Sequence, residues 1–188
     1  MERLERRSED YFVSAIAGCG AQLKSLDHVL AASPQWHKRA QAVVARMRDI
    51  TELLAAVGLT RTPGTLPYRV TYHDPCHLLN AQKLRQPPRQ LLAAIPGLKI
   101  VDLPETEVCC GAAGAYNLAQ PDMANVLGQR KVANIKTTAA TVLATANVGC
   151  ALQIERQLAR AGMSVRVCHV IELLDESYQP FVILPRLK

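Results

Sequence analysis

Apolar and polar positions along the chain follow two different periods. Short apolar runs, typical of buried strands, occur at 11–16, 68–72, 98–103, 141–146 and 164–167. Between the later runs the pattern favours helices over 77–94, with an interruption at Pro87 and Pro88, and over 121–136, 150–161 and 170–174. Strands that alternate with helices predict an α/β fold in which helices cover both faces of a parallel sheet.

In the N-terminal part, the apolar pattern predicts one strand followed by helices. The run at 11–16 leads into a helical stretch that reaches about Leu30. Ser33 and Pro34 are residue types that suit an N-cap and the first helical position. Apolar residues then recur at spacings of three and four from Trp36 to Val57, and Gly58 suits the end of a helix. We expect one long amphipathic helix here.

Two parts of the chain resemble each other. FVSAIAGCGAQLKSL near the N-terminus and VLATANVGCALQIERQL near the C-terminus each read as an apolar strand, a Gly-Cys pair and a helix. This similarity indicates a degenerate duplication. The prolines and glycine of 59–67 predict a linker. We therefore expect a remnant of a first unit with the long helix at 1–58, a second unit at 68–178 and a loosely held tail at 179–188.

Composition and charge favour a cytoplasmic protein. Hydrophobic residues make up 49% of the 188 positions and charged residues 20%. No apolar run approaches the roughly 18–20 residues of a membrane span, and the start MERLERRSEDYF has no signal-peptide pattern. The net charge of +6 comes from scattered basic residues, which favour docking to an acidic partner subunit over binding of nucleic acid.

Four of the six cysteines follow the first three strands of the predicted second unit. Because the interior of a cell is reducing, metal binding or catalysis is favoured over disulfides. Cys76 follows the strand at 68–72, Cys109 and Cys110 follow the strand at 98–103, and Cys150 follows the strand at 141–146. The carboxyl ends of parallel strands meet at one edge of a sheet, so the four thiols are expected to converge there.

Four convergent thiols suit an iron–sulfur cluster, a tetrahedral zinc site or a dithiol catalyst. The chain contains no C-x-x-C, the spacing that zinc sites and dithiol catalysts usually show. The adjacent Cys109 and Cys110 suit two irons of one cluster, because their side chains can diverge. Gly111 would let the backbone approach the sulfides and donate N–H bonds to them.

Other residues near these motifs have two interpretations each. His77 is either an outer hydrogen-bond donor to a thiolate or an ordinary residue at a helix start. Gln153, three positions after Cys150, either donates a hydrogen bond toward the site or faces solvent. Cys19 is a remnant ligand or a buried small residue, and Cys168 is expected to pack in the core.

At these residues the chain resembles the cysteine-rich CCG domain family. The segments YHDPCHLLNAQ, CCGAAGAYN and ANVGCALQIE support this resemblance. The family pattern is a cysteine, then CCG, then C-x-x-C, and this chain has Gln153 in place of the last cysteine. The family occurs in heterodisulfide reductases, lactate utilisation proteins and anaerobic glycerol-3-phosphate dehydrogenases. The chain is most similar to the C-terminal part of the glycolate oxidase iron-sulfur subunit, where the glutamine is expected.

The resemblance implies an electron-transfer component of a glycolate (2-hydroxy acid) oxidase or dehydrogenase complex, without substrate chemistry of its own. It implies that Cys76, Cys109, Cys110 and Cys150 ligate a [4Fe-4S] cluster. FAD is then expected only in flavin-containing partner subunits. Such a complex would bring the chain peripherally to the inner membrane.

The resemblance is to part of a subunit. The C-x-x-C-x-x-C-x-x-x-C-P runs of the glycolate oxidase type are absent, and so is a first CCG, although Cys19 matches the last cysteine position of that first repeat. The chain thus resembles a truncated subunit with one complete repeat. Two alternatives stay open: a subunit-docking module that has no cluster or holds zinc, and a CCG protein of the lactate or heterodisulfide type.

Overall fold

A four-stranded sheet forms the centre of the larger part of the molecule. The computed structural model describes residues 9–179. The strands are β3 (Arg69–Tyr72), β4 (Lys99–Val101), β5 (Val142–Thr145) and β6 (Arg166–His169), and their spatial order is β4-β3-β5-β6. Every pairing in this sheet is parallel, which confirms the predicted α/β class.

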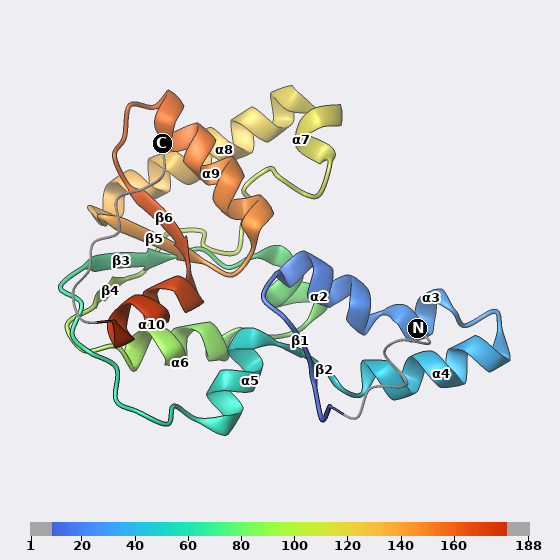
Figure 1. The fold of residues 1–188 in the computed structure, drawn as a ribbon. Helices are drawn as coiled ribbons and strands as arrows, with labels where there is room; N and C mark the ends of the chain where they lie inside the picture. Colours follow the sequence, from blue (N-terminus) through green and yellow to red (C-terminus); the bar gives the residue numbers. More distant parts are fainter. Residues whose placement is uncertain (1–8, 180–188) are drawn as a thin grey trace.

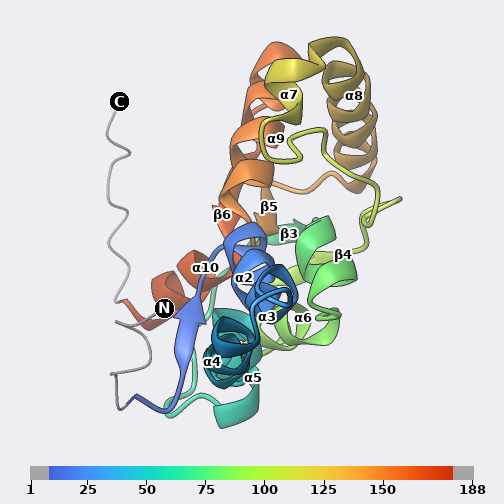
Figure 2. The same cartoon turned by 90° about the vertical axis from the view of Figure 1, so that its right-hand side faces the viewer.

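Helices cover both faces of this sheet. Figures 1 and 2 place α8 (Pro121–Thr138) and α9 (Val148–Arg160) on one side, and α6 (Gln86–Ala93) with α10 (Val170–Tyr178) on the other. The central strand β5 is buried throughout because its side chains alternate between two separate cores. The predicted covering of both faces is therefore present.

The N-terminal part forms a smaller unit beside this sheet. Strands β1 (Phe12–Ser14) and β2 (Met47–Asp49) pair in parallel. The helices that go with them are α2 (Ala17–Lys24), α3 (Leu26–Val29), α4 (Pro34–Val44) and α5 (Ile50–Val57). Helix α2 packs against η1 (His77–Ala81), a short π-helix of the larger part, so the two parts are in contact.

The prediction of one continuous amphipathic helix from Trp36 to Val57 is wrong. Helix α4 ends at Val44, and three residues of strand β2 separate it from α5. Met47 and Asp49 are buried in β2, and the Asp49 side chain accepts a hydrogen bond from the Thr51 backbone N–H at 2.8 Å. This N-cap starts a new helix. A three-residue strand hardly disturbs a spacing of three and four, so the sequence pattern concealed the break.

The strand pairs β1–β2 and β5–β6 have the same construction. In the register of each pair a hydroxyl residue faces the residue that caps the next helix: Ser14 pairs with Asp49, and Thr145 pairs with His169. Both capping residues form a capping box with a glutamate three positions later. Cys19 and Cys150 each lie five positions after the hydroxyl residue.

The remaining described segments are short or irregular. Residues 59–67 form no helix or strand, and a short helix α7 (Tyr116–Ala119) precedes α8. Apart from Gln179, the predicted tail at 179–188 lies outside the described residues. Among residues 9–179, no helix has both the length and the apolar character to cross a membrane.

Leu143→Ala tests the core between β5 and the helices α8 and α9. Leu143 is fully buried, so its truncation should lower the free energy of unfolding by about 2–5 kcal/mol. Urea unfolding followed by circular dichroism measures this loss. Leu118→Ala is the matched control, because Leu118 is 79% exposed and its truncation should cost less than about 0.5 kcal/mol. Equal losses for the two variants would contradict this packing.

Candidate metal centre

The strand order creates a crevice at one edge of the sheet. From β3 the chain passes through α6 on one face to β4, and from β4 it passes through α8 on the other face to β5. The carboxyl ends of the neighbouring strands β3 and β5 therefore lead to opposite faces, and ligands of open α/β sheets bind at such a point.

The predicted cysteines gather in this crevice. A cavity of about 310 Å³ is lined by Cys76, Cys109, Cys110 and Cys150 and also by Cys19. We call it the cysteine cavity. Cys110 and Cys150 are buried, Cys76 and Cys109 are half-buried, and Cys19 is exposed. The parallel sheet therefore brings together thiols that are far apart in sequence, as expected.

The four thiols interact in a chain that runs Cys76, Cys109, Cys110, Cys150. The pKa of Cys109 is lowered by hydrogen bonds from Cys110 and Cys76, and that of Cys150 is lowered, to about 5, chiefly by its hydrogen bond to Cys110. The pKa of Cys76 is raised by its hydrogen bond to Cys109 and then by burial. The pKa of Cys110 is raised by its hydrogen bonds to Cys109 and Cys150 and then by burial. This arrangement favours the thiolate form at Cys109 and Cys150. Full deprotonation would gather four negative charges, which needs a cation in the cavity.

Gly111 is required at its position for two reasons. Its φ of +90° lies in the region that favours glycine, and a Cβ atom would lie 2.6 Å from the Ala124 carbonyl oxygen. The Gly111 N–H donates to the Cys109 sulfur at 3.3 Å. The glycine therefore allows α8 to pack against the CCG loop while its backbone binds a thiol.

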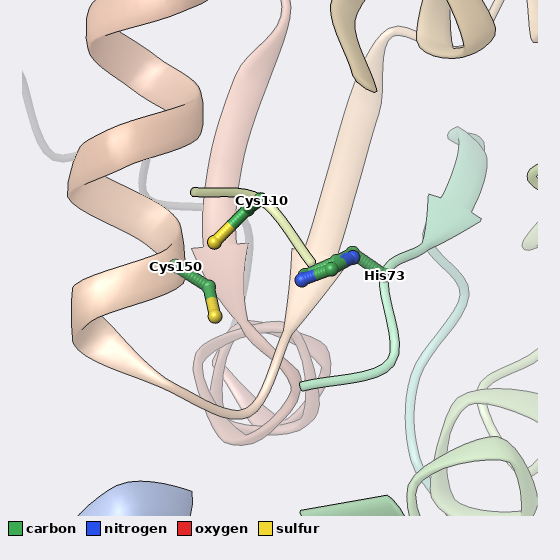
Figure 3. A group of neighbouring side chains, drawn as sticks. All are labelled: His73, Cys110 and Cys150. Atoms are coloured by element: carbon green, nitrogen blue, oxygen red, sulfur yellow. The ribbon is translucent and has the colours of Figure 1, made fainter. Parts of the chain in front are cut away.

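The two histidines of YHDPCH occupy different environments. The Nδ1 atom of His77 lies 3.7 Å from the Cys76 sulfur, a position that suits the predicted outer donor. His73, to which the sequence assigned no role, is 1% exposed. Its ring, Cys110 and Cys150 offer ligand atoms that all lie within 4.8 Å of one another, and Figure 3 shows the three side chains converging. The signal for His73 was its place directly after a buried strand.

Gln153 does not line the cysteine cavity. It is buried, and its Nε2 donates to the carbonyl oxygen of Ala124 at 3.2 Å. Its burial rules out the solvent-facing interpretation, and its amide donates to a backbone carbonyl beside Gly111. The glutamine connects α9 to the start of α8, at the residue that packs against Gly111.

Asn147 and Cys19 connect the cavity to the N-terminal unit. The side-chain Nδ2 of Asn147 donates to the Cys150 sulfur at 3.4 Å, and the side-chain Oδ1 of Asn147 accepts from the Gly18 N–H at 3.1 Å. Sequence analysis missed Asn147, which lies at the N-cap of α9. Cys19 is exposed on α2, which removes its interpretation as a buried residue. Cys168 is buried in the core, as expected.

Buried charges fix the loops that present the cysteines. Asp74, 2% exposed, binds Arg89 through two hydrogen bonds of 2.7 Å and holds the loop after β3. Lys131 is 1% exposed and donates to the Glu105 carbonyl oxygen at 2.6 Å, just before the CCG segment. The Glu105 carboxylate in turn binds Arg130. These charges hold both loops against the helices that flank the sheet.

Together, the fold and the cavity define a class: an α/β domain with a cysteine-lined cavity at the edge of a parallel sheet. Comparison with known proteins makes this specific. Residues 70–155 match the model of the cysteine-rich CCG domain. The chain belongs to this cysteine-rich CCG family.

Its relatives include components of oxidoreductases. The chain is 37% identical to the probable glycolate oxidase iron-sulfur subunit of Bacillus subtilis, over 89% of the chain and 39% of that protein. It is 31% identical to lactate utilization protein A of Geobacillus kaustophilus, over 88% of the chain and 70% of that protein. It is 35% identical to a subunit of the fumarate reductase (CoM/CoB) of Methanothermobacter marburgensis, over 95% of the chain and 35% of that protein. The chain thus spans only part of each relative.

Gly111→Ala should destabilise the protein, because the new methyl group meets the Ala124 carbonyl and the backbone conformation is strained. Gly114→Ala is a matched control: Gly114 also has a positive φ, of +65°, but nothing lies within 4 Å of its added Cβ. We expect Gly111→Ala to lose about 1–3 kcal/mol more than Gly114→Ala in urea unfolding. Similar losses would show that α8 does not press on this loop.

Glu105 should make stability depend on acid pH. The hydrogen bond from Arg130, followed by that from Asn134, lowers its pKa from 4.5 to about 2. The folded protein therefore favours the carboxylate, whose contribution is present above pH 4.5 and is lost as the pH falls toward 2. Urea unfolding of Glu105→Gln across this window should show a weaker loss of stability than the parent protein. An identical pH dependence would contradict the lowered pKa.

Proposed function

We propose that this chain binds a [4Fe-4S] cluster through Cys76, Cys109, Cys110 and Cys150 and serves as an iron–sulfur electron-transfer component of a glycolate (2-hydroxy acid) oxidase or dehydrogenase complex. The observation that carries this proposal is the convergence of the four thiols on one cavity. A bound cluster would supply one-electron transfer. The protein would hold it and set its surroundings.

The residues of the cysteine cavity fit such a group. Thiolates are the usual ligands of iron–sulfur clusters, and these four come from the loops after β3 and β4 and from the first turn of α9. The cationic core of a cluster would also offset the negative charge of four thiolates. Gly111 and Asn147 already direct N–H groups at the sulfurs of Cys109 and Cys150, as expected for a site that holds thiolates.

The position of the cavity suits electron transfer to a partner. Cys76 and Cys109 are half-buried, whereas Cys110 and Cys150 are buried, so a group held by all four would lie just below the surface. A partner protein can then approach the half-buried side. In this proposal the partners are flavin-containing subunits, and FAD is bound by them alone.

One relative is named for glycolate and another for lactate, so each compound is a candidate substrate of the proposed complex. We favour glycolate because the segments around the cysteines resemble that subunit type, for which a glutamine at the position of Gln153 is expected. Mixing the cluster-loaded chain with the flavin subunits of its own organism distinguishes the two. Bleaching of the visible absorption on addition of glycolate supports the proposal, whereas bleaching with lactate alone assigns the chain to the lactate type.

We further infer that residues 1–58 are the end of a first CCG repeat, that 59–67 are the linker and that 68–178 form the second repeat. The matching registers of β1–β2 and β5–β6, with Cys19 and Cys150 at corresponding positions, support this duplication. In the first repeat Cys19 is then a remnant of a ligand position.

A mononuclear zinc site is the second candidate. His73, Cys110 and Cys150 offer one nitrogen and two sulfurs within 4.8 Å of one another, and structural zinc sites use such donors in tetrahedral sets. With Cys109 as the fourth ligand the chain would be a docking module without redox chemistry.

Cys110→Ser should abolish cluster binding, because Cys110 lies at the buried centre of the thiol chain. Iron, acid-labile sulfide and visible absorption are measured after anaerobic reconstitution of the whole chain. Cys168→Ser is the matched control, since Cys168 is also buried but lies outside the cysteine cavity, and it should keep the parent iron and sulfide content. Parent-level iron and sulfide in Cys110→Ser would overturn the ligand assignment. Stoichiometric zinc without sulfide in the parent chain would favour the second candidate.

A further inference from the structure

His73 is a buried histidine at the wall of the cysteine cavity. It is 1% exposed, and within residues 9–179 neither of its ring nitrogens has a hydrogen-bond partner. A buried polar group without a partner destabilises a fold, so such a group usually meets a bound water, ion or ligand. His73 lines the cysteine cavity, so the ligand that it meets lies within that cavity.

The ring is also close to the proposed cluster ligands. A ring nitrogen of His73 and the sulfurs of Cys110 and Cys150 lie within 4.8 Å of one another (Figure 3). The imidazole comes from the end of β3, and the two cysteines come from the loop after β4 and from α9. The ring is therefore held beside Cys110 and Cys150, the two buried thiols of the cavity.

We propose that His73 donates a ring N–H hydrogen bond to a sulfur of the bound cluster, either a cluster sulfide or a ligating thiolate. This inference rests on the proposed cluster. Four irons receive their protein ligands from the four thiols, which leaves the histidine to act as a hydrogen-bond donor. Hydrogen bonds to cluster sulfurs stabilise the more negative, reduced state, so His73 raises the reduction potential.

His73→Phe removes the donor while keeping a flat ring of similar size. The reduction potential of the reconstituted chain, measured by redox titration with EPR detection, should shift to a more negative value. His73→Asn and His73→Gln restore an amide N–H near one or the other ring nitrogen, and at least one of them should recover part of the shift. His37→Phe makes the same chemical change on α4, outside the cysteine cavity, and should leave the potential unchanged.

Each outcome has a definite meaning. An unchanged potential in His73→Phe with a full cluster overturns this inference alone. A shift that neither amide variant reduces also overturns it, because packing and not a hydrogen bond would then be responsible. A parent chain without iron and sulfide overturns the proposed function and this inference with it.

A second measurement keeps His73 itself intact. Pulsed EPR of the reduced His77→Phe chain, which lacks the other histidine beside the thiols and is prepared with ¹⁵N-histidine, should detect a weakly coupled histidine nitrogen. Strong coupling from a directly bound nitrogen, or no coupling at all, would contradict the hydrogen bond. This measurement keeps the inference testable even if the variants at position 73 fail to fold.

Discussion

The candidate site depends on one topological constraint: β3 and β5 are neighbours in a parallel sheet, but the chain leaves them toward opposite faces. The crevice between their carboxyl ends receives Cys76 from one side and Cys150 from the other, and the loop after β4 closes it with Cys109 and Cys110. No local interaction could gather four thiols that are so far apart in sequence. The placement of β5 beside β3 is thus what brings the four thiols together.

Buried polar groups then fix the details that the sheet leaves open. Lys131 and Asp74, both almost fully buried, hold the loops before the CCG segment and after β3. Gln153 donates to the Ala124 carbonyl oxygen at the start of α8. The same oxygen would lie 2.6 Å from a Cβ atom at Gly111. Burying each of these polar or charged side chains destabilises the fold unless its hydrogen-bond partner is in place. The cavity is consequently shaped in advance of any ligand.

The N-terminal unit resembles the part of the fold that carries Cys150, and it contacts the cysteine cavity. Its strand pair repeats the construction of β5–β6, and Asn147 links its backbone at Gly18 to the sulfur of Cys150. Cys19 consequently stands at the wall of the cysteine cavity and not in a core of its own. The unit therefore contributes to the wall of the cysteine cavity, in keeping with its proposed origin as part of a CCG repeat.

The sequence by itself determined the α/β class, most strand and helix positions and the four cysteines, because these depend on local periodicity and on where residues fall relative to strand ends. It did not reveal the strand β2, since three residues between two helices barely disturb a helical spacing. It assigned no role to His73, Lys131 or Asn147 and left two interpretations of Gln153 open, because their partners are distant in sequence. Only the tertiary structure decided these points: a buried side chain takes its role from the atoms that the fold brings against it.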